Sequence, residues 1–252
     1  MRYLILENRH QGFFSDFLLI AGSLCRMYDN DIKEFNVIWK NPLYQTSDYN
    51  MFEKYFYKQE MYSDFNVKCN AHDLSVGMFN FVTPIEIFQK LNIIMNHYGC
   101  FDNEAFIRAK NDSVEKFNTL GVHVRRTDHA RHGELLSDEY YFLKIDENLK
   151  STDYDNIFLA TDDSDVVAKF KNRYGNRIFC NEDITRSNGN IGVHISNQPN
   201  KEKLAYDVMR DGLSMSKCKK ILMTASNVAG YALMVNPTIE YDQIDKHITF
   251  IH

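Results

Sequence analysis

The stretch that decides the fold is Leu120-Gly121-Val122-His123-Val124-Arg125-Arg126-Thr127-Asp128. Its apolar first half predicts a buried strand, and its polar second half predicts a loop at the carboxyl end of that strand. Parallel α/β sheets bind their ligands at this end of the strands. Arginine is always charged, and its planar guanidinium matches pairs of phosphate oxygens. The two arginines therefore indicate a diphosphate-bearing substrate, with a surface pair bridged to Asp128 as the alternative.

Strands alternate with helices along the rest of the chain. Downstream, apolar runs predict strands at residues 121–124, 157–160, 177–180 and 220–223. Helical patterns separate these strands at residues 137–149, 166–174 and 201–215, and another helix begins at residue 227. Upstream, strand patterns at 3–6 and 35–39 flank a helical pattern at 15–27, and a further helix is expected at 84–95. This order predicts an α/β fold with parallel, doubly wound sheets. We expect two lobes with a cleft between them, residues 1–118 and residues 119–252.

The composition excludes several classes of protein. The 252 residues carry a formal net charge of -5, so there is no overall basic field that would imply nucleic acid as a partner. Five cysteines without a CxxC pair argue against a disulfide framework and a structural zinc site, and favour a reducing compartment.

No stretch approaches the roughly 20 apolar residues that span a bilayer. We therefore expect a cytoplasmic protein without an integral membrane segment, with attachment to the inner face of a membrane as an alternative. The oligomeric state stays open, and a homodimer is one alternative.

Three further polar segments follow predicted strands. They are Thr161-Asp162-Asp163, Thr224-Ala225-Ser226-Asn227, and the turn that contains Gly12. One acid of the first segment is expected to orient an arginine, whereas a helix cap is the alternative. The second segment opens a helix with hydroxyl side chains and backbone N–H groups that suit an anion, and it too has a helix cap as its alternative. Gly12 would let the backbone approach a phosphate across the cleft.

Two carboxylates, Asp207 and Asp211, lie on the predicted helix that precedes the strand at 220–223. A carboxylate at this place can accept hydrogen bonds from the adjacent N–H donors of a guanine edge. The alternative for either residue is a solvated helix surface.

Three segments resemble a known family. His123-Val124-Arg125-Arg126-Thr127-Asp128 resembles the HxRRxD motif of the α1,2- and α1,6-fucosyltransferases and the protein O-fucosyltransferases. Ile157-Phe158-Leu159-Ala160-Thr161-Asp162-Asp163 is similar to the corresponding stretch of the α1,6 enzymes. The third segment is similar to the D-x-x-L-M-S-x-C-K segment of bacterial α1,2 enzymes and reads Asp211-Gly212-Leu213-Ser214-Met215-Ser216-Lys217-Cys218-Lys219-Lys220. After it, residues 224–227 stand where that family has a serine-rich phosphate loop. The resemblance covers about residues 119–235.

The resemblance implies a GT-B-like fold with two Rossmann-type lobes. It also implies an inverting, metal-independent transfer of L-fucose from GDP-fucose to a hydroxyl of a glycan acceptor, with no further cofactor. Such an activity fits the synthesis of surface polysaccharides or glycoconjugates. A related transferase that uses another GDP-hexose, and a catalytically silent carbohydrate-binding or scaffold protein of the same fold, remain as alternatives.

The resemblance also assigns expected roles to individual residues. Arg125 would bind the β-phosphate and stabilise the charge on departing GDP, and Arg126 would support the same diphosphate or brace the loop. The other expected donor-binding residues are His123 in the nucleotide pocket, Asp211 on guanine, Ser226 and Asn227 with Thr224 in the phosphate loop, and Gly12 with Phe13 in the first loop. Asp162 or Asp163 would hold the arginine loop in place.

An inverting transfer needs a base that takes the proton of the acceptor hydroxyl. In the α1,6 enzymes a glutamate follows the motif, and here Glu134 lies one residue beyond that spacing. Glu134 is the expected base, and Asp128, His129 and His132 are the alternatives.

Overall fold

The computed structural model describes residues 3–7, 11–30, 36–56, 85–126, 135–187, 192–193 and 200–245. The described elements are β1 (Tyr3–Leu6), α1 (Phe13–Asp29), β2 (Asn36–Trp39), α2 (Met51–Tyr55), α3 (Ile85–His97), α4 (Glu104–Asp112), β3 (Thr119–Val124), α5 (Asp138–Ser151), β4 (Asn156–Thr161), α6 (Ser164–Tyr174), a short 3-10 turn (Gly175–Arg177), β5 (Ile178–Phe179), α7 (Lys201–Met215), β6 (Lys220–Met223), α8 (Asn227–Val235) and β7 (Glu240–Gln243). The predicted α/β class is confirmed, and each predicted strand and helix is present within a few residues of its expected bounds.

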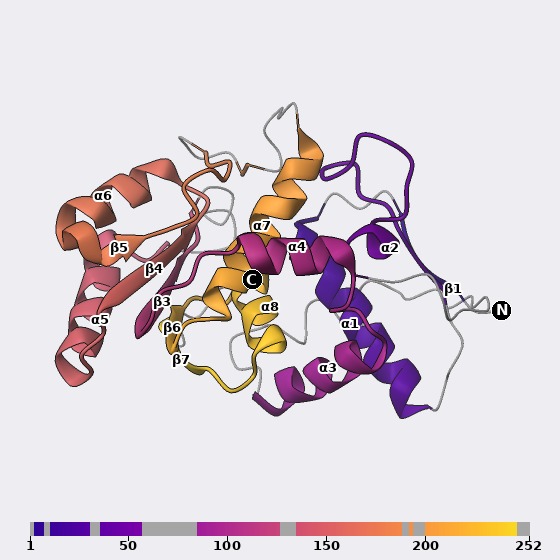
Figure 1. Cartoon of the computed structure of the whole chain (residues 1–252), viewed down its shortest axis with the longest axis horizontal. Helices are drawn as coiled ribbons and strands as arrows, with labels where there is room; N and C mark the ends of the chain where they lie inside the picture. Colours follow the sequence, from indigo (N-terminus) through magenta and orange to yellow (C-terminus); the bar gives the residue numbers. More distant parts are fainter. Residues whose placement is uncertain are drawn as a thin grey trace.

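The C-terminal half forms a parallel sheet with the strand order β5-β4-β3-β6-β7. Side chains on a strand alternate between its two faces. On β4, Ile157 and Leu159 therefore belong to the core formed with α5 and α6, whereas Phe158 and Ala160 belong to the core formed with α7 and α8. In Figure 1, α5 and α6 cover the outer face of the sheet, and α7 and α8 lie between the sheet and the N-terminal elements.

The N-terminal half contains the parallel pair β1 and β2 among its described residues. Its core is aromatic because the first turns of α1 meet the end of β2 and the residue after α2. The ring of Phe13 lies 5.0 Å from that of Trp39, and the ring of Phe17 stacks on Phe56 at 3.8 Å. These contacts bury the start of α1 against its own half of the chain.

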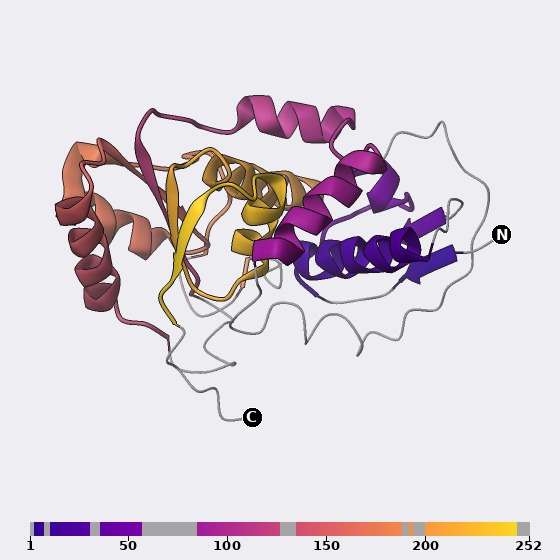
Figure 2. The same cartoon turned by 90° about the horizontal axis from the view of Figure 1, so that it is seen from below.

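A continuous core joins the two halves. Helix α8 contacts α1 and α3, and the ring of Tyr231 on α8 stacks on Phe14 of α1 at 3.9 Å. A Cβ atom at Gly212 of α7 would lie 2.5 Å from the Tyr231 ring, so only glycine lets α7 and α8 approach this closely. Figure 2 shows α8 beside α1 and α3. The C-terminal helices therefore hold a fixed position against the N-terminal half.

The sequence pattern does not predict α2, α4 or β7. β7 reads Glu-Tyr-Asp-Gln and lies at the edge of the sheet, where its side chains alternate between exposed and half-buried. Such a strand lacks the apolar run that marks the central strands of a parallel sheet. Within the described ranges, no helix is long and apolar enough to cross a membrane.

Candidate functional site

The parallel pairing of β3 with β4 brings the arginine loop to an acidic residue. Val124 and Thr161 are partners at the ends of these strands, so the residues that follow them, Arg125 and Asp162, leave the sheet side by side. Arg125 Nη1 donates to Asp162 Oδ2 at 2.6 Å, and the backbone N–H of Arg126 donates to Asp162 Oδ1 at 3.0 Å. One carboxylate therefore fixes both the guanidinium of Arg125 and the backbone of the next residue, as the expected supporting role of Asp162 requires.

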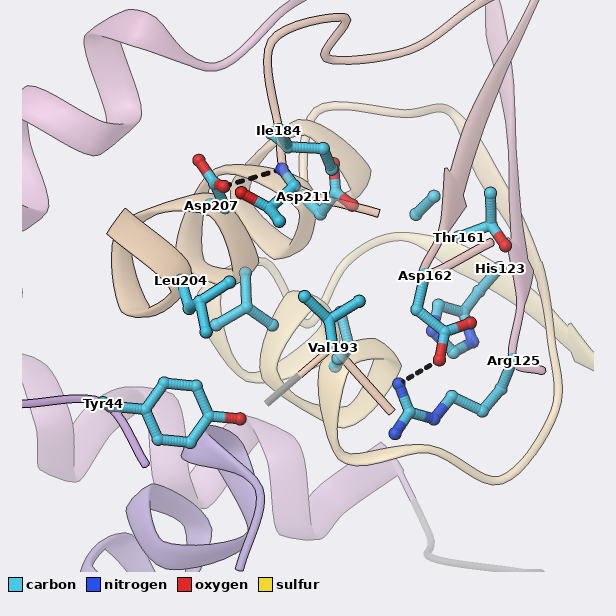
Figure 3. A pocket seen from close by; sticks show the side chains of 14 residues that line it. Tyr44, His123, Arg125, Thr161, Asp162, Ile184, Val193, Leu204, Asp207 and Asp211 are labelled. Carbon is cyan, nitrogen blue, oxygen red and sulfur yellow. Dashed lines mark hydrogen bonds and ion pairs between the residues drawn. The ribbon is translucent and has the colours of Figure 1, made fainter. Parts of the chain in front are cut away.

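A pocket opens at this edge of the sheet, where residues at the carboxyl ends of β3 and β4 line it. It is lined by Tyr44, His123, Arg125, Ala160, Thr161, Asp162, Ile184, Thr185, Val193, Leu204, Asp207, Val208, Asp211 and Val228. Figure 3 shows Arg125 and Asp162 on one side, Asp207 and Asp211 on another, and Tyr44 across the pocket from Arg125. The pocket therefore has the Arg125–Asp162 ion pair on one side and two carboxyl groups on another, with apolar side chains between them.

The acidic side of the pocket is formed by α7. Asp211 is buried, and its Oδ1 accepts a hydrogen bond from Asn181 Nδ2 at 2.8 Å. Burial raises the pKa of Asp211 to about 7, against the opposing effect of the Asn181 hydrogen bond. One turn earlier, Asp207 accepts from the backbone N–H of Thr185 at 2.8 Å and from Lys203 at 2.6 Å. Asp207 thus holds the pocket wall at residues 184–185, and Asp211 is the carboxyl group available to a ligand.

The start of α8 lies beside the histidine of the arginine motif. Ser226 caps this helix by accepting from the N–H of Val228 at 3.3 Å, and Val228 lines the pocket. Ser226 Oγ lies 3.5 Å from His123 Nε2. Asp245 accepts from the N–H of Ala225 at 2.8 Å and so fixes the loop that precedes the helix. The positive end of the helix dipole at Ser226 therefore lies at the pocket, an arrangement that favours an anion.

Several expected site residues take other positions. Asp163 caps α6 through the N–H of Asp165 at 2.8 Å, which is the cap alternative, so Asp162 alone of the two holds the arginine loop. Arg126 lies against the start of α5, which corresponds to the bracing alternative. The side chain of Phe13 is 1% exposed within the aromatic core. Its ring packs α1 against β2 and does not point into the pocket, so the expected contact of Phe13 with the donor stays a prediction for its backbone.

The remaining expected residues are near the site or outside the described residues. The carbonyl of Gly12 accepts from the N–H groups of Ser15 and Asp16 at the start of α1, and Gly12 does not line the pocket. Thr224, Ser226 and Asn227 are not among the residues that line the pocket, and Asn227 precedes the lining residue Val228. Asp128, His129, His132 and Glu134, the candidates for the base, all lie outside the described residues.

Three further residues contribute to the site. Tyr44 reaches the pocket from the N-terminal half, and its ring packs on Phe13 at 5.5 Å. Asn181 contacts Asp211, and Asp245 contacts the backbone of Ala225. Two sequence signals point to Tyr44. It follows the end of β2, the edge at which such sheets bind ligands, and it belongs to a cluster of aromatic residues at 44–57 whose rings can stack on sugars.

Comparison with known proteins gives a match in fold. No protein-family model matches the chain, and no curated protein matches it. A selenomethionine form of fucosyltransferase NodZ from Bradyrhizobium matches with a TM-score of 0.60 at 16% identity, over 96% of this chain and 94% of that one. Another structure of the same enzyme gives 0.57 at 15% identity, over 99% and 98%. NodZ alpha-1,6-fucosyltransferase soaked with GDP-fucose gives 0.55 at 15% identity, over 96% and 95%. Over nearly its whole length, this chain therefore has the GT-B fold of the NodZ fucosyltransferase.

Proposed function

We propose that this chain transfers L-fucose from GDP-fucose to a hydroxyl of a glycan acceptor, with inversion at the sugar carbon and without a metal ion. The observation that carries the proposal is the Arg125–Asp162 pair in a pocket that also contains a buried carboxyl group and the start of a helix. The fold shared with a NodZ structure soaked with GDP-fucose supports the same donor. The cysteine pattern favours the cytoplasm as the location.

The pocket offers complementary groups to both ends of GDP. The diphosphate is placed between the guanidinium of Arg125 and the first turn of α8, where cationic and N–H groups favour negative charge. The guanine is placed against Asp211, whose carboxylate can accept two adjacent N–H donors. Leu204 and Val208 supply apolar contact along the same face of α7. The donor would thus lie along α7 with its sugar toward Arg125.

Arg125 would carry the main electrostatic part of the reaction. When the bond from the fucose carbon to the β-phosphate oxygen breaks, negative charge grows on the departing GDP. A guanidinium that is already oriented stabilises this charge more in the transition state than in the ground state. The 2.6 Å contact with Asp162 supplies that orientation before the donor arrives. The acceptor hydroxyl attacks from the opposite face of the sugar, and Glu134 or Asp128 is proposed to take its proton.

A donor panel tests the proposal. The purified chain is incubated with GDP-fucose, a second GDP-hexose and a UDP-hexose, each with a glycan fraction from the producing cell and with or without a chelator. We expect GDP release and a fucosylated product by mass only with GDP-fucose, at equal rates with the chelator. Transfer from the other GDP-hexose would reassign the donor sugar. Absence of both GDP binding and GDP release would leave a catalytically silent protein of this fold and contradict the proposal.

A further inference from the structure

The turn that carries Tyr44 to the pocket is built around one buried asparagine. Asn41 lies two residues after β2, and its side chain is fully buried. Its backbone carbonyl accepts from the N–H of Tyr44 at 3.0 Å, and its Oδ1 accepts from the N–H of Leu43 at 3.0 Å. Pro42 stands at the second position of this turn, where the fixed φ angle of proline is favourable. Asn41 therefore sets the direction in which Tyr44 leaves the backbone.

The side-chain amide of Asn41 joins this turn to the start of α1. Its Nδ2 donates to the carbonyl of Gln11 at 2.9 Å and to Asp16 Oδ2 at 2.9 Å. Asp16 is itself buried, and the same oxygen accepts from the indole N–H of Trp39 at 3.1 Å. Gln11 comes directly before Gly12, which is expected in the donor loop. One amide thus holds the chain that follows β1 against the chain that follows β2.

The same turn is held from its other side by α7. Lys201, the first residue of this helix, donates from Nζ to the carbonyl of Pro42 at 2.7 Å. The ring of Tyr44 packs on Phe13 at 5.5 Å, and Figure 3 shows its hydroxyl end pointing into the pocket, across from Arg125. A hydroxyl donates one hydrogen bond and accepts two, so the Tyr44 hydroxyl can bind a phosphate or sugar oxygen of the donor.

We infer that Asn41 is a positioning residue for donor binding, because it holds Tyr44 at the pocket. Asn41 is not among the residues that line the pocket, so its effect on the donor passes through the residues that it holds. This inference rests on the proposed function, since that function places GDP-fucose in the pocket that Tyr44 lines.

The test is a double-mutant cycle on Asn41→Ala and Tyr44→Phe. The dissociation constant of GDP-fucose is measured by calorimetry, and thermal unfolding shows that each variant is folded. We expect each single variant to bind GDP-fucose roughly threefold to tenfold more weakly than wild type, which is the effect of one neutral hydrogen bond. The double variant should bind no more weakly than the weaker single variant, because both changes remove the same contact. Losses that multiply in the double variant would contradict a route through Tyr44.

Asn103→Ala is the matched control. Asn103 is another buried asparagine of the N-terminal half, and it lies away from the residues that line the pocket. Its Oδ1 accepts from the N–H of Ala105 at 2.8 Å, and its Nδ2 donates to the carbonyl of Glu53 at 2.8 Å. This variant should lose stability as Asn41→Ala does and keep the wild-type affinity for GDP-fucose. An equal loss of affinity in Asn103→Ala would assign the effect to general destabilisation and overturn the inference.

Asn41→Asp gives a readout that a purely structural role would not move. This change keeps an acceptor for the N–H of Leu43 but places a second carboxyl group beside buried Asp16. The two groups repel when both are ionised, whereas a proton shared between them restores a hydrogen bond. The ratio of variant to wild-type dissociation constants should therefore fall toward unity as the pH is lowered from about 8 to about 5. A weakened affinity whose ratio stays constant with pH would show that the contact with Asp16 does not hold Tyr44.

Lys201→Met tests the same turn from its other side. Lys201 is half-buried, and its replacement removes the contact with Pro42 without opening the core. It should weaken GDP-fucose binding by about threefold, with no further loss when it is combined with Tyr44→Phe. If Asn41→Ala does not fold, this variant carries the cycle, and an unchanged affinity in it would then refute the positioning of Tyr44.

The inference and the proposed function fail in different ways. Unchanged GDP-fucose affinity in folded Asn41→Ala would overturn the inference and leave the proposed function intact, because the wild-type chain still binds the donor. A wild-type chain that binds neither GDP nor GDP-fucose would contradict the proposed function, and the inference with it.

Discussion

Replacing Arg125 by alanine should weaken GDP binding strongly without unfolding the protein. Arg125 lines the pocket with a side chain that is 23% exposed, so a diphosphate can reach it. Charge-assisted hydrogen bonds from a guanidinium contribute about 1.5–3 kcal/mol. Their loss corresponds to a roughly 10- to 150-fold increase in the GDP dissociation constant, since each 1.4 kcal/mol is about tenfold.

The partner of Arg125 adds to this loss. In Arg125→Ala, the carboxylate of Asp162 no longer has the guanidinium at 2.6 Å and lies 11% exposed beside the bound diphosphate. Repulsion between like charges at this place should move the effect toward the upper end of the range. A double variant with Asp162→Asn removes the repulsion and keeps an acceptor for the N–H of Arg126. It should therefore bind GDP more tightly than Arg125→Ala alone.

The assay is a calorimetric titration with GDP, accompanied by thermal unfolding to show that each variant is folded. Arg173→Ala removes an exposed arginine on the outer helices and should bind GDP like wild type. An unchanged GDP affinity in folded Arg125→Ala would refute the placement of the diphosphate at Arg125.

The remaining predictions concern the base, the acidic side of the pocket and the core. Glu134→Gln should abolish transfer from GDP-fucose and leave GDP binding nearly intact; full turnover in this variant, with a loss in Asp128→Asn, would move the base to Asp128. The pKa of Asp211 is raised to about 7, so GDP binding should strengthen as pH rises through 7 and the carboxyl group ionises. The free energy of unfolding should fall as pH rises from about 4 toward 7, because the folded state holds the proton of Asp211 more tightly than the unfolded state does. Asp211→Asn should flatten both profiles, and a pH profile identical to wild type would show that another group titrates. The hydroxyl of Tyr231 is buried without a hydrogen-bond partner among the described residues. Tyr231→Phe should therefore raise the free energy of unfolding by about 1 kcal/mol in a denaturant titration. A loss of stability in this variant would show that the hydroxyl has a partner.

The sequence predicts the fold well where burial leaves a pattern. The central strands β3, β4 and β6 are buried on both faces and read as apolar runs. These strands, and the helices between them along the chain, can therefore be predicted from the sequence. The edge strand β7 alternates between exposed and half-buried side chains and gives no such run. Its place beside β6 depends on pairing across the sheet, which a local pattern does not contain.

The site is predictable to the extent that it follows strand register. Arg125 and Asp162 each follow the end of a strand in one parallel pair, which is why the sequence can place them together. The directions of Arg126 and Phe13 depend on what packs beside them: the first turn of α5 in one case and the Trp39 ring in the other. Tyr44 enters from the other half of the chain. Packing between the halves brings it to the pocket, because α8 contacts α1 and α3, and α7 contacts α4.

The central claim is that the edge of the sheet at Arg125 binds the diphosphate of a GDP-sugar. A crystal structure of the chain with GDP tests it most directly. The account predicts phosphate oxygens within hydrogen-bond distance of Arg125 and the first turn of α8, guanine N–H groups on Asp211, and Arg126 still bound to Leu136 and Asp138. A diphosphate bound elsewhere, or a pocket that stays without nucleotide at saturating GDP, would contradict it.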